Sequence, residues 1–113
     1  MSPRNTTVLQ VATLSIRPGS EQAFERDADK ALRLIAGVDG YLGHELRRSV
    51  EREWHYALMI EWRALAHHTR GFAQSNELAR CQELLRSHLQ APAEVEHFHP
   101  PCLPADQARH VID

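Results

Sequence analysis

Residues Trp54–Trp62 read W-H-Y-A-L-M-I-E-W, an alternating pattern from which the architecture can be worked out. Side chains in a strand point alternately to its two faces, so the large residues at even positions share one face, while Ala57 and Met59 place apolar atoms on the other. Residues Val8–Ile16, V-L-Q-V-A-T-L-S-I, are rich in β-branched side chains and are also apolar on both faces. Two such strands predict a sheet with both faces covered.

The first half of the chain supplies a helix and the partner of a hairpin. Arg17–Ser20 is typical of a strand end followed by a helix start, with Ser20 as the N-cap. Apolar residues then recur at helical spacing up to Gly37, which is a plausible C-terminal stop. Tyr41–Ser49 predicts a second strand, which pairs with Trp54–Trp62 in an antiparallel hairpin.

The second half predicts two helices and a last strand. The pattern favours a short helix over about 64–73, then a helix from Ser75 or Asn76 to about Leu89, and a strand over Ala93–His99. The order strand, helix, strand, strand, helix, strand predicts an α+β, ferredoxin-like βαββαβ fold: a four-stranded antiparallel sheet with its helices on one face.

These elements divide the chain into a domain and a tail. We expect residues 1–99 to form the domain and residues 100–113 to form a Pro-rich C-terminal tail that packs on a partner subunit. A single helix layer covers only one face of the sheet, yet the strands Val8–Ile16 and Trp54–Trp62 carry apolar side chains on both faces. An exposed apolar patch of that size marks an interface, so we expect a homodimer with its sheets face to face.

Composition excludes several classes of partner. The 113 residues include 13 basic and 15 acidic side chains, a net charge of -2, which lacks the basic excess that nucleic-acid binding needs. No apolar run approaches the roughly 20 residues of a membrane span, and no signal peptide is evident. Cys81 and Cys102 have no C-x-x-C spacing. We therefore expect a cytoplasmic protein that binds neither nucleic acid nor membrane.

Several short motifs resemble the antibiotic biosynthesis monooxygenase (ABM) family of dimeric α+β barrels. They are Trp62, Ala66-His67, Gly71-Phe72, Ser75, Leu84-Leu85, Pro92 and Val95–Phe98. The Arg-Pro-Gly turn at 17–19 and the Val-Asp-Gly-Tyr sequence at 38–41 also fit that family, so the resemblance covers residues 8–99.

The resemblance implies a cavity between sheet and helices and an activity within it. Some family members oxygenate aromatic polyketides or oxidise quinols without metal or flavin. An ionised phenolic ring can itself reduce dioxygen, so the protein needs only a base, orienting groups and a dry pocket. The implied function is a small cofactor-independent monooxygenase acting on a phenolic, quinol or polyketide-like aromatic with dioxygen. The sequence contains no Gly-rich phosphate-binding loop, which agrees with the absence of a nucleotide or flavin cofactor.

Two adjacent histidines compete for the role of the base. Helical spacing places His68 beside Leu65 and Phe72, whereas the Ala-His motif favours His67. We expect His68 to be the base, with His67 second. A buried neutral histidine whose hydrogen bonds are satisfied is the alternative for either.

Five further residues are candidates for the pocket. Trp62 is expected to stack on a flat ring, or else to be simply core. Phe72 either lines the pocket or is part of the core. Tyr56 and His44 are candidates for lining the cavity or the dimer seam. Arg47 is either a solvated charge or a handle for an anionic substrate.

Metal and haem sites find less support. His97 and His99 share a strand face, but a metal site needs further ligands that the spacing does not supply. The haem-degrading branch of the family uses an Asn on the first strand and a His on the later helix, where this chain offers Gln10 or Thr13 and Cys81. We expect no cofactor. The alternatives are a non-catalytic or stress-linked binding dimer, whose cavity its own side chains would fill, and a haem-degrading monooxygenase.

Overall fold

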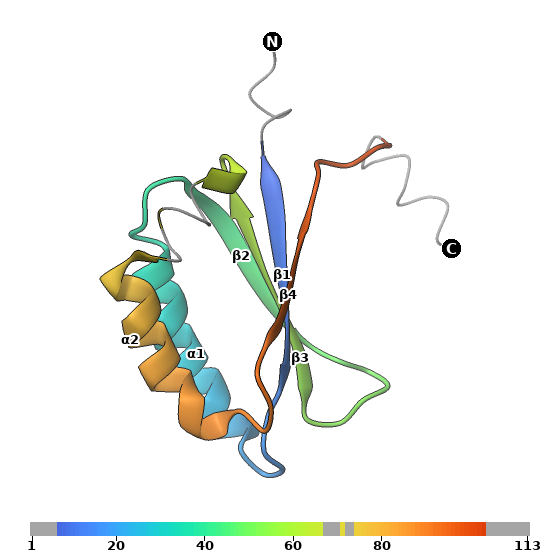
Figure 1. The fold of residues 1–113 in the computed structure, drawn as a ribbon. Helices are drawn as coiled ribbons and strands as arrows, with labels where there is room; N and C mark the ends of the chain where they lie inside the picture. The colour runs from blue at the N-terminus through green and yellow to red at the C-terminus, as the bar shows by residue number, and fades with distance from the viewer. Residues whose placement is uncertain (1–6, 67–70, 72–73, 104–113) are drawn as a thin grey trace.

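A computed structural model describes residues 7–66, 71 and 74–103, and it confirms the ferredoxin-like α+β prediction (Figure 1). The elements follow in the predicted order: β1 (Val8–Ser15), α1 (Glu21–Ile35), β2 (Tyr41–Arg48), β3 (His55–Trp62), α2 (Asn76–Leu85), the 3-10 turn η4 (Arg86–His88) and β4 (Glu94–Phe98). The helix predicted over 64–73 falls largely outside the described residues.

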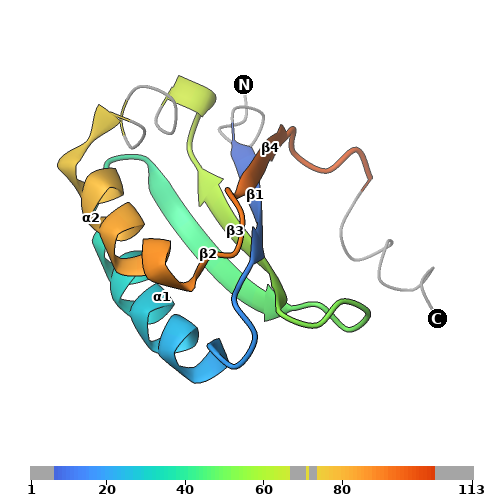
Figure 2. The same cartoon turned by 60° about the horizontal axis from the view of Figure 1, so that its bottom comes forward.

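The four strands form one antiparallel sheet in the order β2-β3-β1-β4. The two strands with apolar side chains on both faces, β1 and β3, are therefore the central ones. Ala12 in β1 lies opposite Leu58 of β3 and Val95 of β4, which sets the register across the sheet. Figures 1 and 2 show α1 and α2 side by side on one face of this sheet.

Helix α1 forms where predicted, but its two ends differ from the expected caps. Ser20 precedes the helix, yet its hydroxyl makes no capping bond because its backbone is near-helical (φ -94, ψ 6) rather than extended. Its carbonyl oxygen instead accepts the Phe24 N–H at 2.7 Å. The helix ends at Ala36 in a right-handed conformation, and the Gly37 N–H reaches Leu34 O at 3.2 Å, so the end closes without a left-handed glycine.

Helix α2 starts as predicted and ends earlier. Ser75 is its N-cap, and the Ser75 hydroxyl accepts the Leu78 N–H at 3.1 Å. The helix was expected to run to Leu89, but it tightens into η4 and the backbone turns extended at Leu89. Leu89 forms a bridge with Ile16, and the Gln90 N–H donates to Ser15 O at 2.8 Å, so pairing with the sheet ends the helix.

Two buried clusters lie between the helices and the sheet. The first holds Ala31, Leu32, Ile35, Ile60, Trp62 and Cys81. The second holds Ala12, Leu14, Ile16, Phe24, Ala28 and Tyr56. The first cluster draws on even-numbered residues of β3, and the second on even-numbered residues of β1 and β3. These positions share the face that the alternating pattern assigned to the core.

The opposite face of the sheet is left uncovered by the described residues. Leu9 and Val11 of β1 and Ala57 and Met59 of β3 point to this face and are half-buried, and Phe98 of β4 is 44% exposed. Apolar side chains thus remain at the surface where the sequence predicts an interface.

Neither helix nor the 3-10 turn in the described part of the chain combines the length and apolar character of a membrane-spanning segment.

Candidate functional site

A cavity of about 780 Å³ lies between the sheet and α2, within the size range of small-molecule sites. The sheet, α1, α2 and the segment between η4 and β4 all contribute to its wall. The lining residues are Gln10, Ala12, Leu14, Ile35, Leu58, Ile60, Leu78, Cys81, Gln82, Leu85, Arg86, Leu89, Gln90, Ala91, Pro92, Ala93 and Val95. The cavity is mainly apolar with a few polar groups, which is typical of a ligand pocket.

Helical periodicity explains why one face of α2 lines the cavity. Leu78, Cys81 and Leu85 recur at intervals of three and four and form its apolar wall. Gln82 and Arg86 lie beside them, four residues apart, and are exposed to solvent. These two polar side chains therefore form part of the rim of the cavity.

Gln10 is the buried polar residue of the cavity wall. Its side chain points from β1 toward the helices and is only 6% exposed. The Gln10 Oε1 accepts a hydrogen bond of 2.9 Å from Trp62 Nε1, which fixes the orientation of the amide. Because the carbonyl oxygen is held by Trp62, the NH₂ group is the part of the amide left to donate to a ligand oxygen. A buried donor of this kind favours a polar partner in the cavity.

Trp62 lies behind this glutamine rather than in the cavity wall. It is fully buried in the first core cluster, and the described contacts relate it to the cavity through its bond to Gln10. Sequence reasoning singled out Trp62 and treated Gln10 only as a departure from asparagine. The sequence did contain a clue to Gln10, because it is an amide side chain within a largely apolar strand.

Cys81 contributes a protonated thiol to the cavity wall. Burial raises the pKa of Cys81 to about 11, and its Sγ lies 3.4 Å from Ala31 O. The nucleophilic form of cysteine is the thiolate, so this thiol is inert near neutral pH.

Tyr56 lies in the second core cluster, outside the cavity wall. Its hydroxyl donates to Glu25 Oε2 at 2.6 Å, and the Arg48 Nε donates to the same oxygen at 2.7 Å. Burial, followed by the bond to Glu25, raises the pKa of Tyr56 to about 12. The Tyr56 hydroxyl therefore ties β3 to α1.

His44 and Arg47 line a second, shallower groove between α1 and β2. His44 Nδ1 lies 2.6 Å from the Tyr41 hydroxyl, and Arg47 pairs with Glu45 at 2.6 Å. The structure thus places these residues in three separate locations: Trp62 in the first core cluster, Tyr56 in the second, and His44 and Arg47 in the groove. His67, His68 and Phe72 lie outside the described residues. Within the described part of the chain, no cluster of three or more His, Cys, Asp or Glu side chains is arranged to hold a metal ion.

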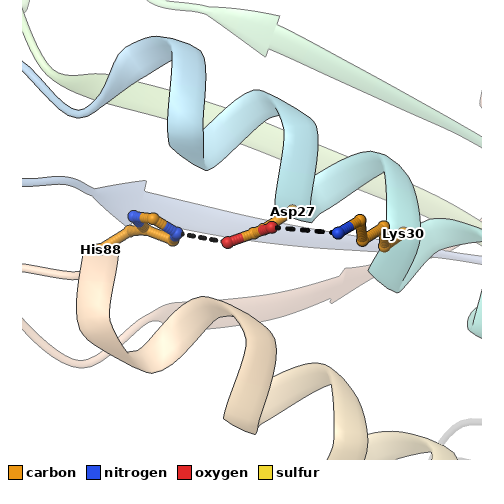
Figure 3. A network of polar contacts seen from close by, with 3 residues as sticks. All are labelled: Asp27, Lys30 and His88. Carbon is orange, nitrogen blue, oxygen red and sulfur yellow. Dashed lines mark hydrogen bonds and ion pairs between the residues drawn. The ribbon is translucent and has the colours of Figure 1, made fainter.

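A polar contact anchors the cavity wall to α1. His88 in η4 is only 12% exposed at its side chain, and its Nε2 lies 2.7 Å from Asp27 Oδ2, while Lys30 Nζ lies 4.0 Å from Asp27 Oδ1 (Figure 3). The hydrogen bond from His88 is the main cause that holds the pKa of Asp27 below its ordinary value of 3.8. The bond joins the end of the cavity-lining helix to the helix beneath it.

Asp27→Asn is expected to lower the melting temperature at neutral pH, because a charge-assisted bond becomes a weaker neutral one. A lowered carboxyl pKa stabilises the fold above the unfolded-state value and stops doing so as pH falls through the folded-state value. The difference in melting temperature from wild type should therefore be present at neutral pH and disappear as pH falls below 3.8. Thermal unfolding across pH measures this.

Asp29→Asn is the matched control for this prediction. Asp29 lies on the same helix and pairs with Arg33 at 3.0 Å, but both side chains are well exposed. Exposed pairs contribute little, so its melting temperature should stay close to wild type. Equal losses in the two variants would contradict a specific role for the His88 contact.

The profile of a protein family described as antibiotic biosynthesis monooxygenase matches residues 7–84. A relative in Bacillus subtilis (strain 168), the uncharacterised protein YczJ, is 37% identical over 91 residues, which cover 80% of this chain and 96% of YczJ. The matched segment runs from the start of β1 almost to the end of α2, so it includes Gln10, Trp62 and most of the α2 wall.

Solved structures show the same fold. A Bordetella bronchiseptica protein assigned to the antibiotic biosynthesis monooxygenases has a TM-score of 0.80 and 26% identity, over 83% of this chain and 96% of that one. SnoaB, a cofactor-independent oxygenase from Streptomyces nogalater, has a TM-score of 0.74 and 20% identity, over 88% of this chain and 98% of its own.

Proposed function

Since the chain belongs to the antibiotic biosynthesis monooxygenase family, we propose that it oxidises a phenolic, quinol or polyketide-like aromatic with dioxygen, without a cofactor, in the cavity beneath α2. The observation that carries this proposal is the Gln10 amide, a buried and oriented donor in the wall of a large apolar cavity. The side chains that line the cavity do not fill it, which favours a substrate site over the non-catalytic alternative with a filled cavity.

The proposed mechanism begins with ionisation of the substrate. His68 removes the proton of a ring hydroxyl, and the Gln10 NH₂ group donates to the oxygen that becomes negative. The ionised ring then reduces dioxygen. For a ring CH₂ group that becomes a carbonyl, one oxygen atom enters the product, and the other leaves as water with the two hydrogens removed from carbon. The apolar wall keeps bulk water away from the reactive anion.

In this mechanism Trp62 is a positioning residue. Its indole N–H holds the Gln10 carbonyl oxygen at 2.9 Å, so the donor end of the amide stays turned away from Trp62. The stacking role expected for Trp62 would require a ligand to reach past Gln10. Tyr56, His44 and Arg47 take no part in this mechanism because none of them lines the cavity.

Oxygen consumption tests the proposed function directly. Purified protein in metal-free buffer is given a panel of hydroquinones and anthrones, and the products are identified by mass spectrometry. Enzyme-dependent oxygen uptake with incorporation of one labelled oxygen atom is the expected result. Binding of these compounds without oxygen uptake would favour the binding-dimer alternative. Stoichiometric hemin binding followed by its conversion to a bile-pigment-like product would favour haem degradation.

The uncovered face of the sheet supports the proposed homodimer. Met59 lies near its centre, between Val11 of β1 and Glu45 of β2. Face-to-face pairing of two such sheets would bury Leu9, Val11 and Met59 in each copy. A specific interface buries at least about 1,200 Å² in total, so the proposed pairing requires most of this face in each copy to be covered.

Met59→Lys is expected to convert the dimer to a monomer, because it replaces the apolar side chain at the centre of the face by a long charged one in both copies, and burying those charges costs free energy. Sedimentation equilibrium at micromolar concentration should give about twice the 12.9 kDa chain mass for wild type and a single chain mass for the variant. Met59→Leu keeps the size and apolar character and should stay dimeric. A monomeric wild-type protein would rule out the dimer.

A further inference from the structure

Arg86 occupies a special position on the rim of the cavity. It belongs to η4 and follows Gln82 by four residues, about one helical turn, and both side chains line the cavity. Among the described residues that line the cavity, Arg86 alone carries a formal charge at neutral pH. From the described part of the wall, a ligand therefore meets a positive charge and no carboxylate.

No carboxylate of the described residues pairs with this guanidinium. Arg33, Arg47 and Arg48 each have an acidic partner within 3.0 Å. His88, two residues further along the chain, contacts Asp27 on α1 (Figure 3). Arg86 is thus left to bind a ligand, and the planar fork of its N–H groups fits a carboxylate through two parallel hydrogen bonds.

Gln10 and Arg86 lie toward opposite ends of β1. The Leu89 bridge to Ile16 places η4 near the C-terminal end of β1, whereas Gln10 lies near its N-terminal end. A rise of roughly 3.3 Å per residue separates Gln10 from Leu14 by about 13 Å. Between them the floor is apolar, with Ala12 and Leu58 side by side. This arrangement suits an elongated flat ligand with one polar group at each end.

We propose that the cavity selects an aromatic ligand that bears a carboxylate, and that Arg86 is the residue that binds it. The ring lies on the apolar floor, an oxygen at one end accepts from Gln10, and the carboxylate at the other end pairs with Arg86. The inference rests on the proposed function for the aromatic body of the ligand and adds the anionic group to it.

Isothermal titration with an anthraquinone carboxylate and the carboxamide of the same ring position tests the proposal without any reaction. Wild type should bind the carboxylate at least about tenfold more tightly than the carboxamide. Arg86→Gln should lower carboxylate affinity about tenfold and leave carboxamide affinity within about twofold. Arg86→Lys should recover part of the loss. Arg80→Gln removes the same charge from α2 outside the cavity wall and should change neither affinity.

The outcomes separate this inference from the proposed function. If wild type binds both compounds equally and Arg86→Gln changes nothing, the carboxylate site is wrong while the aromatic cavity stands. Equal losses in Arg86→Gln and Arg80→Gln would show a general charge effect and also overturn it. If neither compound binds wild type, the inference and the aromatic cavity fall together. Arg86 is exposed, so the variant should keep the wild-type melting temperature, and binding is compared on that condition.

Discussion

Replacing His68 by alanine should lower turnover by about 10²–10⁴-fold, because a well-placed general base contributes that much. The dimer and the affinity for an unreactive aromatic should remain unchanged, since the proposed role of His68 is to accept a proton rather than to bind the ring. The wild-type rate should also fall at acidic pH, because a protonated imidazole no longer accepts a proton. Steady-state oxygen uptake across pH, for wild type and variant, measures both effects.

His67→Ala is the matched control, one residue away on the same segment. If the segment is helical, as the sequence predicts, His67 lies on the side opposite Leu65 and Phe72, and its loss should cost little activity. The reverse result, with His67→Ala inactive and His68→Ala active, would show that the Ala-His motif identifies the base and that the periodicity does not. If neither variant loses activity on a substrate that wild type oxidises, neither histidine is the base.

The fold was predictable because its signals are local and periodic. Alternation in Val8–Ile16 and Trp54–Trp62 and the apolar spacing of α1 depend on residues only a few positions apart. Element ends were harder, because they depend on distant partners. Helix α2 stops at Leu85 because Leu89 and Gln90 pair with the end of β1, and no residue within the helix signals that contact.

The site was less predictable than the fold for the same reason. Gln10 and Trp62 are 52 residues apart, and the role of each depends on the bond between them. The Tyr56 hydroxyl is held by Glu25, 31 residues away, so its aromatic character gave no hint that it faces α1. Arg86 was within reach of sequence reasoning, because it shares the helical spacing of Leu78, Gln82 and Leu85.

Gln10→Leu should lower turnover by roughly 10²–10³-fold, the usual cost of removing one donor to a developing negative oxygen. Leucine fills a similar volume and suits the apolar floor, so the cavity should stay intact. Because the bond strengthens as the substrate oxygen becomes negative, the loss should fall on kcat, with little change in KM. Stopped-flow oxygen uptake at saturating substrate measures kcat directly.

Trp62→Phe distinguishes donation by Gln10 from a structural role of the pair. This variant keeps a buried ring and the Gln10 amide but removes the N–H that orients it. Turnover should fall only about two- to tenfold, the value of one ordinary hydrogen bond, because the donor is still present and only its orientation is lost. Both variants remove the same Gln10–Trp62 bond, so a purely structural pair would give equal losses of melting temperature and activity in the two. If Gln10→Leu loses much of its kcat and Trp62→Phe loses little, the Gln10 NH₂ group donates to the substrate oxygen during the reaction.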